Sequence, residues 1–195
     1  MASIADRLQP VAQELLSAWL RLPRADGPVP MRANFDPMSI ARILPVVSLF
    51  ERIGEDRWRM RLIGTEIERR WGRSLTGKNY TDVMTPAAAA STLCEFKAVC
   101  GHPCGSLSRR HLSLRSGRQL DAETLRLPLR ANDGTISLIL SCSGELSDRF
   151  LHESDQWQEI VTVVEQEFFD IGAGVPEWVC APPPTEEATD LEAVD

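Results

Sequence analysis

The sequence predicts an α+β protein built on a five-stranded antiparallel sheet, with central helices on one face and flanking helices at its N- and C-terminal ends. Two observations predict this class. Two strand-like runs joined by a short turn precede a set of short helices, and three further strand-like runs follow that set. An amphipathic, helix-like segment lies at each end of the series. The 195 residues, 43% hydrophobic and 25% charged, suffice for one domain with a core of its own.

The first element is predicted as a helix over residues 10–22, because Pro10 suits the first helical position and apolar residues recur at helical spacing. A loop rich in Pro and Gly, residues 23–30, follows it. Asp36-Pro37 then predicts the start of a short helix that ends near Leu44-Pro45. The apolar residues on one face of the first helix are Val11, Leu15, Trp19 and Leu22.

A β-hairpin is predicted next, with strands over residues 46–53 and 57–63 and a polar turn over 54–56. Basic and apolar residues alternate along the second strand. One face of that strand is therefore expected to be basic and wet, and the other apolar and buried. The basic residues are Arg57, Arg59 and Arg61, and the apolar ones are Trp58, Met60 and Leu62.

Helical signals follow the hairpin. Thr65 with Glu68 three residues later is typical of a capping box, and Gly72 predicts the end of that short helix. Thr85-Pro86 predicts a second cap, which opens a longer helix that ends at Gly101. The central helices are therefore expected between residues 65 and 101.

The rest of the sequence predicts a three-stranded meander and a final helix. The strands are expected over residues 107–115, 118–130 and 135–144, with turns rich in Gly, Ser, Asn and Asp between them. The final helix is expected to begin near Ser154 and to end at Gly172. Its apolar residues, at spacings of three and four, are Trp157, Ile160, Val161, Val164, Phe168 and Ile171.

Several short motifs occur in one order within residues 8–146. A Trp-bearing helix precedes an Asp-Pro turn, a Leu-Pro leads into a strand, and a strand that ends in Gly-Thr precedes a Gly-Arg-Ser-Leu-Thr-Gly segment. These motifs are Trp19, Asp36-Pro37, Leu44-Pro45, Gly64-Thr65, residues 72–77 and the later Leu127-Pro128-Leu129 and Asp133-Gly134. Together they resemble a family of small alphaproteobacterial single-domain PAS-like proteins, once catalogued as a domain of unknown function. The resemblance implies a PAS fold and signalling through a ligand or a partner.

Four segments are expected along the chain. Residues 1–30 hold the N-terminal amphipathic helix and its loop, residues 31–150 the PAS-like core, and residues 151–175 the C-terminal helix. Residues 176–195 are expected to be a disordered acidic tail, because they offer little apolar surface to bury. The last fifteen residues hold five acids and no base, so they supply most of the net charge of −7.

The function expected from this organisation is that of a stand-alone sensory or regulatory module, without an output domain of its own. A ligand pocket is expected between the inner face of the sheet and the central helices. Enzymatic activity is not predicted, because the sequence lacks a nucleophile elbow, a P-loop, a His-Glu-x-x-His motif and a dinucleotide fingerprint. The candidate pocket residues are Met60, Leu62, Trp71, Met84, Phe96 and Cys142.

Cyclic dinucleotide binding is one alternative function. Residues 57–78 hold seven basic side chains against two acidic ones, and Arg69 and Arg73 form an Arg-x-x-x-Arg pair. A solvated basic surface explains the same pattern, and so does a docking site for an acidic partner. The candidate basic patch comprises Arg57, Arg59, Arg61, Arg69, Arg70 and Arg73, with Lys78 at its end.

A metal or thiol protein built on Cys100, His102 and Cys104 is the other alternative. No cofactor is strongly implied. Haem is not favoured, because His102, His111 and His152 each have a plainer interpretation, and no cysteine lies in the motif of a photoactive flavin site. We therefore expect no metal site, and the thiols are interpreted as small buried hydrophobic groups.

The expected location is the cytoplasm, because the N-terminus lacks the basic and apolar regions of a signal peptide and no apolar run is long enough to cross a membrane. The cysteines, five in number and irregularly spaced, agree with a reducing compartment. A homodimer formed through the terminal helices is expected, together with a signalling partner protein. Neither nucleic acid nor a membrane is expected as a partner.

Overall fold

The computed structural model describes residues 4–114, 119–145 and 157–177. Two helices begin the chain, α1 (Ile4–Arg7) and α2 (Pro10–Leu20), and Pro10 occupies the first position of α2 as the sequence predicts. Single turns of 3₁₀ helix follow at Arg32–Asn34, Pro37–Ile40 and Leu44–Val46.

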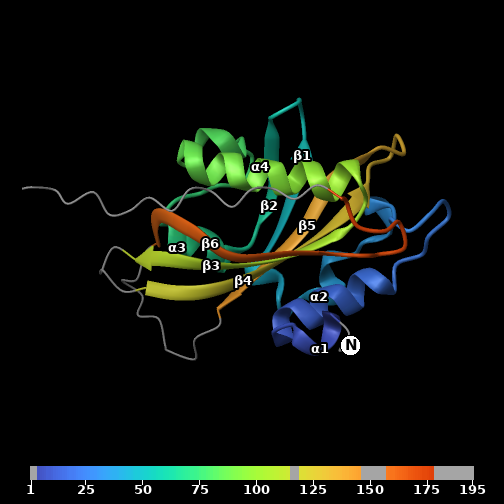
Figure 1. The fold of residues 1–195 in the computed structure, drawn as a ribbon, viewed down its shortest axis with the longest axis horizontal. Coiled ribbons are helices and arrows are strands. Elements are labelled where there is room, and N and C mark those ends of the chain that lie inside the picture. The colour runs from blue at the N-terminus through green and yellow to red at the C-terminus, as the bar shows by residue number, and fades with distance from the viewer. Residues whose placement is uncertain (1–3, 115–118, 146–156, 178–195) are drawn as a thin grey trace, which may run out of the picture.

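The centre of the fold is one antiparallel sheet in the strand order β2-β1-β5-β4-β3-β6 (Figure 1). The predicted hairpin and meander are confirmed, since β1 pairs with β2 and β4 pairs with both β3 and β5. The described sheet has six strands, however, and not five. The strands are β1 (Val47–Arg52), β2 (Trp58–Ile63), β3 (Gly105–Leu114), β4 (Gln119–Arg130), β5 (Ile136–Glu145) and β6 (Trp157–Phe169).

Helices cover both faces of this sheet. The helices α3 (Thr65–Trp71) and α4 (Pro86–Gly101), with a 3₁₀ turn at Tyr80–Asp82 between them, follow the hairpin. Figure 1 shows α4 along one face and α1 and α2 on the opposite face. We call these the α4 face and the α2 face. Because both faces are covered, alternate residues of the inner strands point into two different interiors.

The core accordingly divides into two clusters. On the α2 face, leucines from β4 and β5 pack against Leu15, Leu16 and Trp19 of α2. The indole nitrogen of Trp19 donates a hydrogen bond of 2.9 Å to the carbonyl oxygen of Pro128, so this buried polar group is satisfied. On the α4 face, the cluster is aromatic: Phe50, Trp58, Tyr80 and Phe96 pack together with ring centroids 4.8 to 5.8 Å apart.

The predicted C-terminal helix over residues 151–175 is wrong, because residues 157–169 form strand β6 on the edge of β3. The apolar spacing in this segment is helical, but the run is rich in β-branched residues, which favour strands. The edge of β3 also offers unpaired backbone groups, which β6 satisfies. Gly105 of β3 lies so close to the ring of Phe169 that a Cβ atom there would be 2.1 Å from it.

The predicted capping box at Thr65 and Glu68 is also wrong. The N-cap of α3 is Gly64, whose place admits no side chain because a Cβ atom would lie 2.1 Å from the carbonyl oxygen of Pro45. Glu68 instead accepts hydrogen bonds from the backbone N–H groups of Leu75 (2.8 Å) and Thr76 (2.9 Å). The predicted cap at Thr85 is confirmed, since its hydroxyl accepts from the N–H of Ala88 at 3.4 Å.

Only some of the expected segment boundaries fall within the residues that the structure describes. The boundary at residue 150 and most of the expected tail, residues 178–195, lie outside the described residues. Within the described ranges, no helix is both long and apolar enough to span a membrane.

Candidate functional site

A cavity of about 100 Å³ lies on the α4 face, between the middle strands of the sheet and the helices α3 and α4. Its outer wall is apolar and includes an aromatic ring and two methionines. Trp71, Met84 and Ala88 are only partly buried, so the cavity opens to solvent beside them. The apolar residues that line it include Phe50, Met60, Ile63, Ile67, Trp71 and Met84.

The floor of the cavity, by contrast, is polar. It is formed by side chains of β1, β3, β4 and β5 that alternate with the apolar residues of the α2 face. The hydroxyl groups of Thr124 and Ser143 lie 3.1 Å apart and hydrogen-bond each other. The polar floor residues are Ser48, Arg110, Thr124, Arg126, Ser141 and Ser143.

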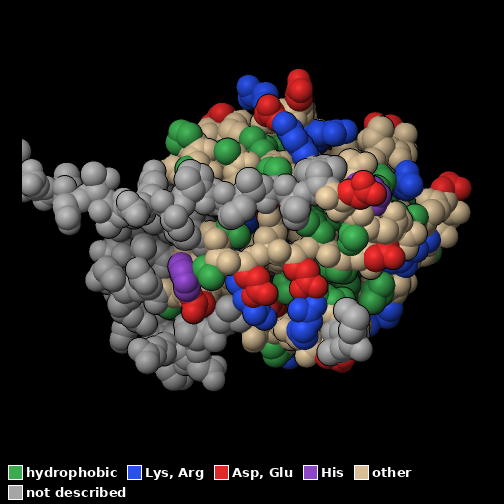
Figure 2. All heavy atoms as spheres, in the orientation of Figure 1, with side chains coloured by type: hydrophobic (Ala, Val, Ile, Leu, Met, Phe, Trp, Pro, Cys, Tyr) green, Lys and Arg blue, Asp and Glu red, His purple; other side chains and the backbone are tan. Residues whose placement is uncertain are grey.

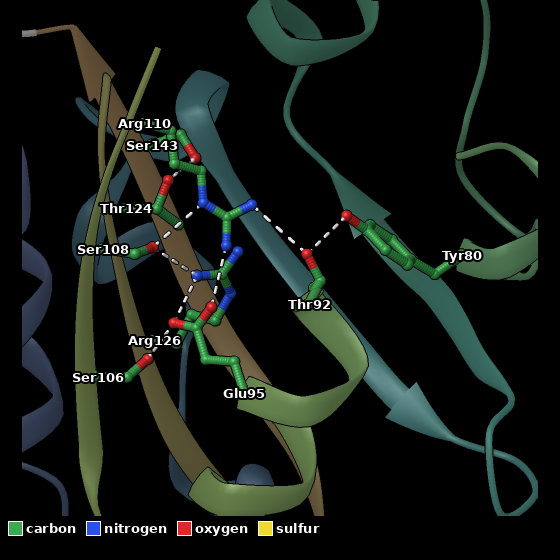
Figure 3. Close-up of polar contacts among 9 residues, drawn as sticks. All are labelled: Tyr80, Thr92, Glu95, Ser106, Ser108, Arg110, Thr124, Arg126 and Ser143. Carbon is green, nitrogen blue, oxygen red and sulfur yellow. Dashed lines mark hydrogen bonds and ion pairs between the residues drawn. The ribbon is translucent and has the colours of Figure 1, made fainter. Parts of the chain in front are cut away.

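A buried charge network lies beside this floor (Figure 3). The carboxylate of Glu95, a residue of α4 with no exposed surface, accepts from Arg110 Nη2 at 2.9 Å and from Arg126 Nη1 at 2.7 Å. The hydroxyl of Ser106 donates to the same carboxylate. Ser108 accepts from Arg110 Nε (3.2 Å) and Arg126 Nη1 (3.0 Å). The network therefore joins α4 to β3 and β4 through charge-assisted hydrogen bonds.

Two further contacts extend the network. Arg110 Nη1 donates to the hydroxyl of Thr92 at 3.4 Å, and Thr92 in turn accepts from the hydroxyl of Tyr80 at 3.0 Å. The guanidinium of Arg126 lies over the ring of Phe96, with its central carbon 5.6 Å from the ring centroid. Tyr80 belongs to the cavity wall, so the network reaches both sides of the cavity.

Burial and charge act against each other in this network. Burial alone would raise the pKa of Glu95, but Arg126 and Arg110 outweigh it and hold the pKa below its usual value. Burial lowers the pKa of Arg126 to about 10, which still leaves it charged at neutral pH. Both arginines and the glutamate therefore carry their charges together inside the protein.

The structure brings together three of the six predicted pocket residues, since Met60, Trp71 and Met84 line the cavity. Phe96 lies behind them in the aromatic cluster of the same face. Leu62 and Cys142 belong to the cluster of the α2 face and do not line the cavity.

A register shift in the hairpin explains the position of Leu62. Leu49 pairs with Leu62, but the next residue, Phe50, pairs with Met60, so Arg61 is an extra residue in β2. Such a β-bulge breaks the alternation of side chains along a strand. Met60 and Leu62, which strict alternation places together, therefore lie on opposite faces.

Cys142 lies on the α2 side of β5, and not at the cavity as predicted, for a different reason. In a strand with one wet face, Ser141 and Ser143 would point to water and Cys142 to the interior. Both faces of β5 are covered, and the serines are the residues that reach the cavity. Because both faces are covered, alternation along the strand does not predict the polar floor.

One sequence signal could have revealed the network. Thr92, Glu95, Phe96 and Val99 recur at helical spacing on one buried face of α4. A carboxylate in the middle of such a face must find a cationic partner. Arg126, which lies between two leucines of β4, and Arg110 of the neighbouring strand β3 are such partners.

The predicted basic patch is divided among three places. Arg57, Arg59 and Arg73 border one shallow surface hollow together with Lys78 and Asp82. Arg61 borders a second hollow, beside Arg32, Glu51 and Asp133. The third place is helix α3, which carries Arg69 and Arg70.

Most of these charges have acidic partners. Arg69 and Arg70 both bind Glu66, at 2.7 and 2.8 Å, and the hydrogen bond from Arg69 contributes most to lowering the pKa of Glu66 to about 2. Glu51 lies 3.3 Å from Arg61 and 3.9 Å from Arg59. These pairs reduce the positive charge that a cyclic dinucleotide would meet at this surface.

The cysteine and histidine cluster is largely buried. Burial raises the pKa of Cys100 and of Cys104 to about 12, so both thiols stay protonated at neutral pH and are poor nucleophiles or metal ligands. In the part of the chain that the structure describes, no three His, Cys, Asp or Glu side chains gather in a way that could hold a metal ion. Of the other histidines, His111 contacts Asp121 at the surface, and His152 lies outside the described residues.

Comparison with known proteins identifies the family. A family model described as a PAS domain matches residues 8–143, which is well over half of the chain. The match covers α2, both central helices and the strands β1 to β4, with nearly all of β5. No curated protein matches the chain.

Proposed function

Since the chain belongs to the PAS domain family, a family of sensory and regulatory modules in signalling, we propose that it senses a small molecule bound in the cavity on the α4 face. The cavity itself carries this proposal. Its wall is apolar and its floor holds a few convergent polar groups, which is the usual composition of a small-molecule site.

The large side chains of the α4 face leave this space open. Phe96 packs against Phe50 at 4.9 Å and against Trp58 at 4.8 Å between ring centroids, and it does not line the cavity. The space lies beyond that cluster, between Trp71 and Met84 on one side and Arg126 on the other. Close-packed interiors hold few such voids, and polar voids normally hold water or a ligand.

Strand β4 offers a route from the cavity to the N-terminal helix. Ala122, Thr124 and Arg126 face the cavity, whereas Glu123 between them is buried on the other side of the sheet. The carboxylate of Glu123 accepts a hydrogen bond of 2.8 Å from the backbone N–H of Gln9, at the start of α2. A ligand that displaces β4 would therefore also displace the contact that holds α2.

We assign the output to a partner protein or a second copy of the chain that contacts α2. The predicted homodimer interface uses both terminal helices, but the C-terminal element is the strand β6, so only the N-terminal helix is available for it. The apolar face of α2 is buried on the chain's own sheet, with Leu15 and Trp19 fully buried. A homodimer thus stays a prediction, and sedimentation of the full chain with and without ligand measures it.

Filling the cavity tests ligand binding. We expect Ala88→Leu to abolish the thermal shift caused by any small molecule that the full chain binds, because the larger side chain occupies the space beside Met84. Ala90→Leu is the matched control, since Ala90 is exposed on the same helix and does not line the cavity. A ligand whose effect survives Ala88→Leu binds elsewhere and contradicts the proposal.

A further inference from the structure

The charges beside the cavity do not balance. Arg110 and Arg126 line it with only 8% and 5% of their surface exposed, and both bind the single carboxylate of Glu95. Among the described residues that line the cavity, these arginines are the only charged ones. Two buried positive charges thus share one negative charge, and an uncompensated buried charge is unfavourable.

Arg126 also has donor capacity to spare. Its Nη1 atom binds Glu95 and Ser108, but its buried Nε atom has no hydrogen-bond partner among the described residues. A buried N–H group without an acceptor costs free energy. An acceptor that enters the cavity would lower that cost and the charge imbalance together.

A carboxylate has the right shape and charge for this acceptor. Its two oxygens match the fork of N–H groups on a guanidinium, and one negative charge neutralises the excess of one positive charge. A dianion such as phosphate would reverse the imbalance. The hydroxyl groups of Ser48, Ser141 and Ser143, in the same floor, supply neutral donors to the second oxygen.

The rest of the cavity limits the body of the ligand. The cavity is also lined by Met60, Ile67 and Trp71, which offer no charge to a second ionic group. The volume of about 100 Å³ is smaller than a cavity that holds benzene, about 150 Å³, so a chain of more than a few carbon atoms would extend through the opening beside Trp71 and Met84. The body is therefore apolar and short.

We infer that the cavity binds a small monocarboxylate with a short apolar chain, whose carboxylate lies against Arg110 and Arg126 and whose chain lies against Trp71 and the methionines. This inference rests on the proposed function and names the chemical class of its ligand. The acid is a free small molecule, because the cavity is too small for a folded or extended polypeptide segment.

Calorimetric titration of the full chain with butyrate, butyramide and inorganic phosphate tests the inference. We expect butyrate to bind at least tenfold more tightly than butyramide, which has the same shape and no charge. Phosphate should bind at least tenfold more weakly than butyrate. Equal affinity for butyrate and butyramide would overturn the charge argument, and tighter binding of phosphate would overturn the choice of a monoanion.

Charge variants give changes of opposite sign. Arg110→Gln removes the excess charge, while Arg126 still pairs with Glu95, so we expect butyrate affinity to fall at least tenfold and butyramide affinity to change little. Glu95→Gln raises the excess charge and should strengthen butyrate binding. Arg109→Gln is the control, because Arg109 directly precedes Arg110 in β3, contacts Glu123 on the α2 side and does not line the cavity.

The outcomes separate this inference from the proposed function. If butyramide binds as well as butyrate, and Ala88→Leu abolishes both, the cavity is a ligand site with another chemistry. If butyrate and butyramide bind neither wild type nor Arg110→Gln, and neither probe shifts the thermal midpoint of either protein, the monocarboxylate inference is wrong. The Ala88→Leu test with other ligands then decides the proposed function. If Glu95→Gln does not fold, Arg110→Gln and the probe series still decide the inference.

Discussion

The two faces of the same sheet have opposite chemistry. On the α2 face, Leu125, Leu127 and Leu140 pack against α2 in a largely apolar interior. On the α4 face, neighbouring residues of the same strands are arginines, serines and threonines around a cavity. Adjacent residues of β4 thus enter environments that differ in charge, hydrogen bonding and packing.

From this difference we infer that the α4 face, although it also packs an aromatic cluster, is the face available for binding. Each leucine fully buried on the α2 face contributes roughly 1.5–3 kcal/mol by leaving water. Buried ion pairs contribute little net stability, because desolvation offsets their attraction. A polar network beside an unfilled space is therefore better explained by a ligand than by stability. Four predictions test the contrast, from the largest expected effect to the smallest.

The largest effect is expected from Arg126→Met on the α4 face. It removes the hydrogen bonds that Nη1 donates to Glu95 (2.7 Å) and to Ser108 (3.0 Å), and because a hydrogen bond of a charged group contributes about 1.5–3 kcal/mol, we expect a total loss of at least about 3 kcal/mol. Urea unfolding measures the loss. Arg59→Met, at a half-exposed arginine of β2, is the control and should cost no more than about 1 kcal/mol. Similar losses for both variants would contradict a buried, charged network.

The α2 face should respond to loss of volume instead of loss of charge. Leu127→Ala removes a fully buried side chain, and such changes cost about 2–5 kcal/mol because a cavity remains. The affinity for any ligand of the α4 face should stay within about threefold of wild type, a difference of about 0.6 kcal/mol. A loss of stability below 1 kcal/mol in urea would mean that α2 is loosely packed.

Acid should destabilise the α4 face more than the α2 face. The pKa of Glu95 is held low in the folded protein, so its contribution is present above the ordinary glutamate pKa of about 4.3 and is lost as pH falls through the lowered value. Unfolding free energies at pH 7 and pH 3.5 should therefore differ less in Glu95→Gln than in wild type. Leu127→Ala removes no titrating group and should keep the wild-type difference. An unchanged difference in Glu95→Gln would show that Glu95 is not the carboxyl responsible.

The smallest effect is expected at the edge of the sheet. Arg109 and Glu165 form an exposed pair at 2.9 Å across β3 and β6, and Figure 2 shows acidic and basic side chains side by side along this strip. Glu165→Gln should cost no more than about 1 kcal/mol, and the difference should vanish in 1 M NaCl, which screens exposed charges. A loss that persists in high salt would mean that Glu165 anchors β6 in another way.

The elements with strong local signals were predictable from the sequence. Pro10, Thr85-Pro86 and Gly72 mark helix ends by their own backbone chemistry, and the turn at residues 132–134 does the same between β4 and β5. The family motifs additionally predicted the PAS fold. These signals predict structure from the sequence because each depends only on residues that are close together along the chain.

The errors occurred where distant segments meet. Residues 157–169 have helical spacing, yet they pair with β3, because the open edge of β3 binds a strand. Met60 and Leu62 separate because of a bulge that depends on pairing with β1. Neither the edge nor the register can be read from the segment itself.

By itself, the sequence determined the PAS domain family and the order along the chain of five of the six described strands, and it predicted a pocket beneath the central helices. Only the tertiary structure decided which residues form that pocket. Alternation along a strand separates two faces, but it does not show whether the polar face meets water or a second interior. That depends on α4, which covers the face and places Glu95 against Arg110 and Arg126, residues 15 and 31 positions further along the chain.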